Sequence, residues 1–190
     1  MYGRFIHTAL PLLTLACAAT GSSAAAPTAQ PRTPRPPIVI ARPTAPTLPQ
    51  LLLDRHNAVR RAAGVPPLVW DPQLATGAVA YAHTISQTGQ LVHSPRASRP
   101  GIAENLWVGT AGAYAPDAGV ASWVEERADY VDGIFPAVSR TGNWLDVSHY
   151  TQMIWRTTTH VGCGLVRSAR WEALVCRYSP RGNRDGQRPR

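Results

Sequence analysis

The chain has 190 residues, 44% of them hydrophobic, and a formal net charge of +8. Residues 51–180 nevertheless hold 11 arginines against 10 acidic residues, so most of the excess charge lies outside this segment. Nucleic-acid recognition needs a basic face on the fold itself. Composition and charge therefore argue against a nucleic-acid-binding protein.

Residues 1–26 have the pattern of an export signal. Arg4 precedes an apolar run over 9–19, and small residues follow over 20–26. This order is typical of a secretory signal, and the run is shorter than the roughly 20 residues that span a bilayer. We expect a secreted, extracellular or periplasmic protein without a transmembrane segment. A lipid anchor on Cys17, as in bacterial lipoproteins, is the alternative.

The remaining chain divides by composition. Eight prolines fall within residues 27–49, and such a stretch favours extended, solvated backbone. We predict a Pro-rich linker over 27–47, one folded domain over 48–184 and a basic, disordered tail over 185–190. A domain of this length can bury about two-thirds of its unfolded surface, so it can form its own core.

The first half of the domain predicts two helices. Apolar residues recur at helical spacing over 48–63, and Gly64 ends the pattern. A proline pair then enforces extended chain. Asp71 and Pro72 supply a capping carboxylate and a proline at the first helical position, so a second helix begins here. This helix ends at Gly89.

The second half predicts a long loop over 92–105, a helix over 116–130 and a short helix over 148–156. Two strands, 162–167 and 171–178, follow as a hairpin with a tight turn. Helices first and a hairpin last are typical of an α+β fold. We expect helices flanking a small antiparallel sheet.

A disulfide is predicted within this hairpin. If Cys17 leaves with the export signal, Cys163 and Cys176 are the two cysteines that remain. A two-residue loop at 169–170 would set them opposite each other, and facing Cα atoms in an antiparallel pair lie roughly 4.5–5.5 Å apart. An even cysteine count in an exported chain favours a bond. A bond that closes so short a loop stabilises by about 3 kcal/mol.

Seven segments of the domain form an ordered series: 56–60, 68–71, 93–94, 103–106, 123–126, 149–155 and 176–183. The last two read HYTQMIW and CRYSPRGN. Together the segments resemble the CAP superfamily of cysteine-rich secretory, antigen 5 and pathogenesis-related proteins, whose unit is the SCP domain. We expect a bacterial single-domain member. The resemblance implies a three-layer α-β-α sandwich, which agrees with the element order above.

The cleft of this family holds two histidines and two glutamates. Matched motif by motif, the resemblance assigns these positions to four residues, the cleft tetrad: His93, Glu104, Glu126 and His149. Glu126 is preferred to Glu125, because the family places its glutamate three residues after the tryptophan, here Trp123. The four side chains could ligate zinc or another divalent ion. They could equally hydrogen-bond to one another without a metal.

The other histidines and the tryptophans are weaker candidates. The resemblance implies a packed, hydrogen-bonded structural role for His56. We expect His83 to be exposed. His160, just before the hairpin, is expected to be structural, and a position at the edge of the cleft is the alternative. The six tryptophans could form a lipid-contacting surface, but in a small domain they belong more often to the core.

Two functions follow for the cleft. The first is a non-enzymatic, monomeric binding protein for a divalent metal, a small ligand, or a lipid or cell-wall component. The alternative is a metal-dependent extracellular hydrolase, resembling a protease, with Glu104 or Glu126 as general base. The sequence contains neither a His-Glu-x-x-His nor a Gly-x-Ser-x-Gly motif, which argues against the hydrolase. A lipid carrier is a third hypothesis and needs an apolar groove.

Overall fold

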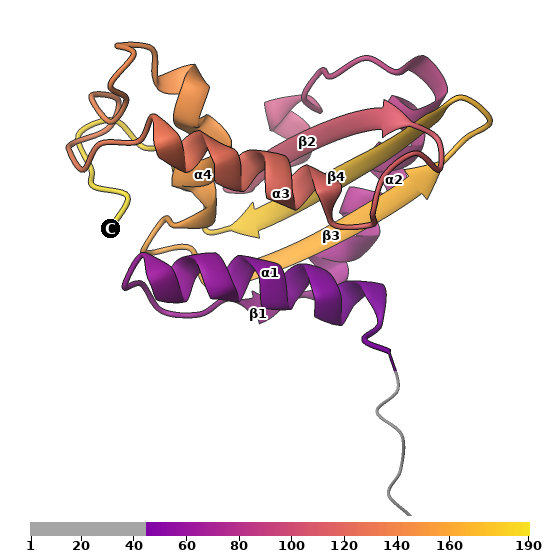
Figure 1. Cartoon of the computed structure of the whole chain (residues 1–190), viewed down its shortest axis with the longest axis horizontal. Helices are drawn as coiled ribbons and strands as arrows, with labels where there is room; N and C mark the ends of the chain where they lie inside the picture. The colour runs from indigo at the N-terminus through magenta and orange to yellow at the C-terminus, as the bar shows by residue number, and fades with distance from the viewer. Residues whose placement is uncertain (1–44) are drawn as a thin grey trace, which may run out of the picture. The chain divides into compact units, whose positions relative to one another are not determined.

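The computed structural model describes residues 45–190 and is drawn in Figure 1. The predicted export signal, Cys17 and nearly all of the predicted linker lie outside the described residues. Within residues 45–190, no helix combines the length and the apolar character needed to cross a membrane.

A four-stranded sheet forms the middle of the domain. Its strands are β1 (Val69–Trp70), β2 (Ala103–Thr110), β3 (His160–Arg167) and β4 (Trp171–Ser179), in the order β1-β3-β4-β2. The β3–β4 and β4–β2 pairs are antiparallel, whereas β1 is parallel to β3. The predicted small sheet is therefore antiparallel except for the two-residue strand β1, which makes it mixed.

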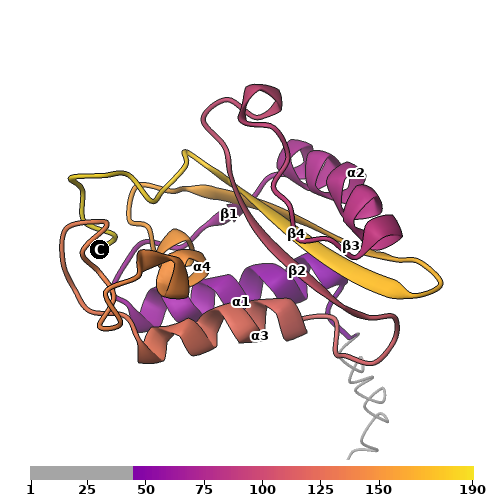
Figure 2. The same cartoon turned by 90° about the horizontal axis from the view of Figure 1, so that it is seen from above.

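Helices cover both faces of this sheet. They are α1 (Leu48–Ala62), α2 (Pro72–Thr88), α3 (Ala118–Glu125) and α4 (Ser148–Met153). Figure 2 shows α2 alone on one face and α1, α3 and α4 on the other. The predicted α-β-α sandwich is confirmed.

Local capping residues explain where the first two helices begin. Thr47 and Gln50 form a reciprocal capping box at the start of α1. The Asp71 carboxylate accepts hydrogen bonds from the first free amides of α2. Gly89 ends α2 with a left-handed φ of 70°, a conformation that glycine adopts without strain. The predicted bounds of both helices hold to within one residue.

Three other expected elements differ from the structure. The predicted loop over 92–105 ends early, because β2 begins at Ala103 and pairs with β4 along its whole length. The helix expected over 116–130 is α3 followed by a 3-10 turn, Glu126–Ala128. The helix expected over 148–156 stops at Met153.

The core fills the space between each helical layer and the sheet. Leu52 of α1 and Trp123 of α3 pack on one face with buried side chains of β3 and β4. Ala78, Ala82 and Ile85 of α2 pack on the other face. The cleft lies outside this core, at the end of the sheet where β2 begins and β4 ends.

The hairpin has the predicted register and bond. Cys163 faces Cys176 in the β3–β4 pair, their Cα atoms are 4.1 Å apart, and a disulfide joins them. The backbone amide of Ser168 donates to the carbonyl of Trp171 at 2.8 Å, which closes the predicted two-residue turn. The bond ties the two central strands together inside the core.

The last residues differ from the expectation of a disordered tail. The amide of Gly186 donates to Phe135 O at 2.9 Å, and the amide of Phe135 donates to Gln187 O at 2.8 Å. The guanidinium of Arg190 lies 5.6 Å from the ring centroid of Tyr130. Backbone hydrogen bonds and a cation–π contact therefore hold residues 185–190 against the loop after α3.

Candidate functional site

A cleft opens where the start of β2 meets α4 and the segment that follows β4. Its volume is about 230 Å³. His93, Glu104 and His149 of the cleft tetrad line it, and Glu126 lies behind His149. The walls also carry arginines, amides, Trp144 and Leu145.

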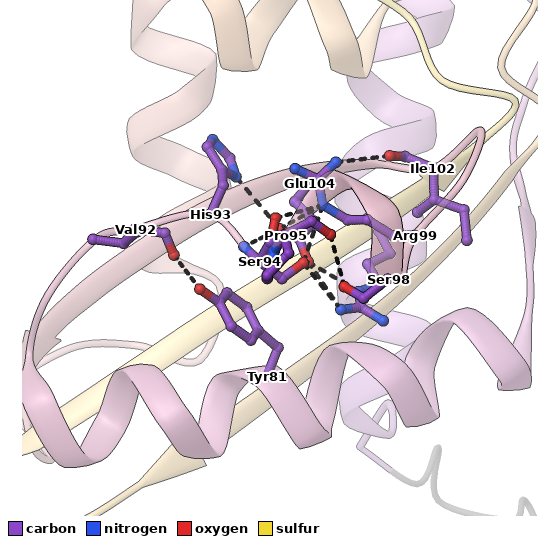
Figure 3. A network of polar contacts seen from close by, with 10 residues as sticks. Tyr81, Val92, His93, Ser94, Pro95, Ser98, Arg99, Ile102 and Glu104 are labelled. Atoms are coloured by element: carbon purple, nitrogen blue, oxygen red, sulfur yellow. Dashed lines mark hydrogen bonds and ion pairs between the residues drawn. The ribbon is translucent and has the colours of Figure 1, made fainter.

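Glu104 and His93 form the first histidine–glutamate pair, which Figure 3 shows from close by. The Glu104 side chain is fully buried, and its Oε2 lies 3.4 Å from Nδ1 of His93, which is 54% exposed. Ser94 donates from its backbone N at 3.1 Å and from its hydroxyl at 2.7 Å. Arg99 and Arg177 complete the shell, with nitrogens 3.2 Å and 3.0 Å from the carboxylate.

These donors keep Glu104 ionised. Burial by itself raises the pKa of this carboxyl, because it penalises the charged form. The hydrogen bonds from His93 and Ser94 and the charge of Arg99 outweigh burial and lower the pKa of Glu104 to about 2. Glu104 is therefore a permanent buried anion at neutral pH.

Glu126 and His149 form the second pair. Glu126 follows α3 directly, and its Oε2 accepts hydrogen bonds from the backbone amides of His149 at 2.9 Å and Tyr150 at 3.0 Å. Its Oε1 lies 2.5 Å from Nδ1 of His149. Trp123 stacks on the imidazole, with ring centroids 5.7 Å apart and an interplanar angle of 17°. One carboxylate and one indole thus fix the orientation of His149.

In both pairs the histidine faces its glutamate with Nδ1. A histidine that donates Nδ1–H to a carboxylate carries its free lone pair on Nε2. Within residues 45–190, Nε2 of His93 and Nε2 of His149 make no hydrogen bond. Two residues that line one cleft therefore each have an imidazole Nε2 without a hydrogen-bond partner among the described residues.

The four tetrad side chains do not converge on one point. Across the described part of the chain, the one group of three or more potential ligand atoms within 4.8 Å of one another is His56, Cys163 and Cys176. Both of these sulfurs are in the disulfide, so neither is a thiolate ligand. A metal in the cleft would be held by the two histidines, with the glutamates behind them.

His56 instead belongs to a chain of hydrogen bonds that reaches the cleft. Its Nδ1 lies 2.7 Å from Leu52 O, and its Nε2 lies 2.8 Å from the hydroxyl of Tyr178. Asn105 donates to that hydroxyl at 3.2 Å and to the carbonyl of His149 at 3.1 Å. Burial, the largest cause, lowers the pKa of His56 to about 4, so the ring is neutral at neutral pH.

Several residues of this site had no role in the sequence-based prediction. Four of them, Asn105, Tyr178, Ser94 and Arg177, lie inside the segments that resemble the CAP family. The resemblance assigned a function only to the cleft tetrad. Arg99 lies between segments and had no local signal. His83 and His160 are exposed and do not line the cleft.

The fold and the site define a class of protein: an α-β-α sandwich with two histidine–glutamate pairs beside one cleft. Comparison with known proteins gives the family. The family model described as "Cysteine-rich secretory protein family" matches residues 53–178. The chain belongs to this family, the CAP family.

Curated relatives agree with this assignment. The pathogenesis-related protein PR-1 type of Sambucus nigra is 38% identical over 143 residues, which cover 74% of this chain and 81% of that protein. Pathogenesis-related leaf protein 4 of Solanum lycopersicum is 37% identical over 142 residues, covering 74% and 82%.

Solved structures share the fold. The crystal structure of NaASP2 with Zn2+ has a TM-score of 0.64 at 23% identity, covering 75% of this chain and 84% of that chain. The structure of BmVAL-1 has a TM-score of 0.60 at 22% identity, covering 79% and 84%. At these identities the likeness supports the architecture alone.

Proposed function

We propose that this chain is an exported, non-enzymatic binding protein whose cleft holds a divalent ion, zinc first among them, between His93 and His149. The observation that carries the proposal is the pairing of each Nδ1 with a glutamate, which leaves Nε2 for a ligand. Metal-binding histidines commonly give their other ring nitrogen to a carboxylate. In this arrangement Glu104 and Glu126 orient the histidines and do not bind the ion.

An ion held by two imidazoles keeps further coordination positions for water or for an oxygen of a second ligand. NaASP2, which shares the fold, has been crystallised with Zn2+. The disulfide between Cys163 and Cys176 supports export, because such bonds persist in oxidising compartments.

The hydrolase alternative has less support from this geometry. A general base needs a pKa near the working pH and a free lone pair. Glu104 has a pKa of about 2, and its oxygens are occupied by serine and arginine donors. Glu126 accepts two backbone amides and the imidazole of His149. Neither glutamate is placed to activate water.

A zinc titration followed by calorimetry tests the proposal. The signal-free protein should bind one zinc ion per chain, and His93→Ala/His149→Ala should abolish this binding. His83→Ala/His160→Ala removes two exposed histidines outside the cleft and should bind zinc like the parent. Unchanged zinc binding after loss of His93 and His149 would contradict the proposal, as would a parent protein that binds no divalent ion.

A further inference from the structure

Arginines gather on one side of the cleft, where the loop around the 3-10 turn Arg96–Ser98 meets the segment after β4. The backbone amide of Arg181 donates to Gly101 O at 2.9 Å and ties the two segments together. Between them lies a hollow of about 260 Å³, which we call the arginine hollow. It is walled by five residues: Arg96, Arg99, Gly101, Ile102 and Arg181. The three arginines also line the cleft, so the two spaces share a wall.

This corner carries more positive charge than its carboxylate neutralises. Glu104 pairs with both Arg99 and Arg177. Within residues 45–190, Arg96 and Arg181 form no ion pair, although six other arginines do. The arginine hollow is thus lined by three arginines, of which only Arg99 has a carboxylate partner among the described residues, and it shares that partner with Arg177. Such an excess of positive charge in a recess concentrates anions.

The charges also act on one another. Burial lowers the pKa of Arg99, Glu104 raises it, and the nearby charges of Arg96 and Arg177 lower it again. Arginines held close together without matching carboxylates repel each other. An anion among them would relieve that repulsion.

Arg99 is already ordered for such a role. Its side chain is 7% exposed, Nε donates to the Ser94 hydroxyl at 3.0 Å, and Nη1 donates to Ile102 O at 2.8 Å (Figure 3). Its Nη2 makes no hydrogen bond within the described residues. A guanidinium fixed in advance loses little conformational freedom on binding. The guanidinium fork matches the oxygens of phosphate and carboxylate groups.

From this geometry we propose that the arginine hollow binds an oxyanion, a phosphate or carboxylate group on the ligand that enters the neighbouring cleft. Arg96 and Arg181 close on the anion from two segments of the chain, and Arg99 forms the fixed wall. The inference names the ligand chemistry of the proposed binding cleft, but it requires no metal ion.

Calorimetric titration with inorganic phosphate and, separately, with glucuronate tests the inference in metal-free buffer at constant ionic strength. At least one of the two anions should bind saturably, and the tighter one identifies the preferred group. Arg96→Gln/Arg181→Gln should weaken that binding about tenfold or more, because two charge-assisted hydrogen-bonding groups are lost. Arg96→Gln alone should give a smaller loss of the same kind.

The control Arg61→Gln/Arg170→Gln removes the same charge from exposed positions outside the hollow and should change the affinity by less than twofold. His93→Ala/His149→Ala should keep the anion affinity, which separates this inference from the zinc proposal. The inference fails if neither anion binds saturably. It also fails if the control loses as much affinity as Arg96→Gln/Arg181→Gln.

Discussion

His56 and Glu104 are both buried, and the groups around them fix opposite charge states. His56 stays neutral because the core penalises its cation. Glu104 stays ionised because serine, histidine and arginine donors surround it. Both pKa values lie below those of the unfolded chain, so in both cases the unfolded state takes up its proton first as the pH falls. Lowering the pH therefore reduces the free energy of unfolding through both His56 and Glu104.

For His56 the predicted window runs from pH 6.5, its ordinary pKa, down to its folded value of about 4. The stability due to neutral His56 is complete above pH 6.5 and declines by about 3 kcal/mol across this window. Urea unfolding at pH 7, 5.5 and 4 measures the decline. His56→Gln should flatten it, whereas His83→Gln, at an exposed position, should not. A His56→Gln variant with the slope of the parent would contradict the assignment.

The elements that the sequence predicts well are those with local signals. Asp71, Pro72 and Gly89 mark both ends of α2 without help from the rest of the chain. β2 lacks such a signal, because its stability comes from pairing with β4, distant in sequence. β1 has two residues and is recognisable only by its bonds to β3. Strand order and direction likewise depend on contacts that one segment does not encode.

Glycines of β3 set how closely α2 approaches the sheet. A Cβ on Gly164 would collide with the backbone of Val79 in α2. We expect Gly164→Ala to lower the free energy of unfolding by about 1–3 kcal/mol, as overpacking of a core does. Gly109→Ala, on β2, is the matched control, because its Cβ would meet the side chains of Trp107 and Tyr114, which can move. Equal losses in chemical denaturation would argue against a fixed α2–β3 distance.

At the scale of the whole molecule, the sandwich assembles the cleft from distant segments. His93 comes from a loop, Glu104 from β2, and Glu126 and His149 from the two ends of the α3–α4 connection. The resemblance to a family indicated which four residues belong together. It did not indicate that they form two separate pairs, nor that arginines adjoin them, because both facts depend on tertiary packing.

The disulfide should stabilise this assembly without being part of the cleft. Cys163 and Cys176 lie 13 positions apart, so the bond closes a short loop. Cys163→Ala/Cys176→Ala should lose about 3 kcal/mol in urea unfolding. Zinc affinity should stay within about twofold of the parent, because the cleft is built from other elements. Loss of zinc binding in a folded variant would show that the hairpin bond shapes the site.

The orientation of the two cleft histidines is tested most directly by nitrogen NMR on protein labelled with 15N-histidine, which shows which ring nitrogen carries the proton. If Glu104 and Glu126 orient these histidines for a ligand, the neutral rings of His93 and His149 should carry the proton on Nδ1, and their Nε2 signals should shift when zinc is added. His83→Ala and His160→Ala assist the assignment. A proton on Nε2 in either residue would contradict the claim that Glu104 and Glu126 orient the histidines for a ligand. Nε2 chemical shifts that do not change when zinc is added would also contradict it.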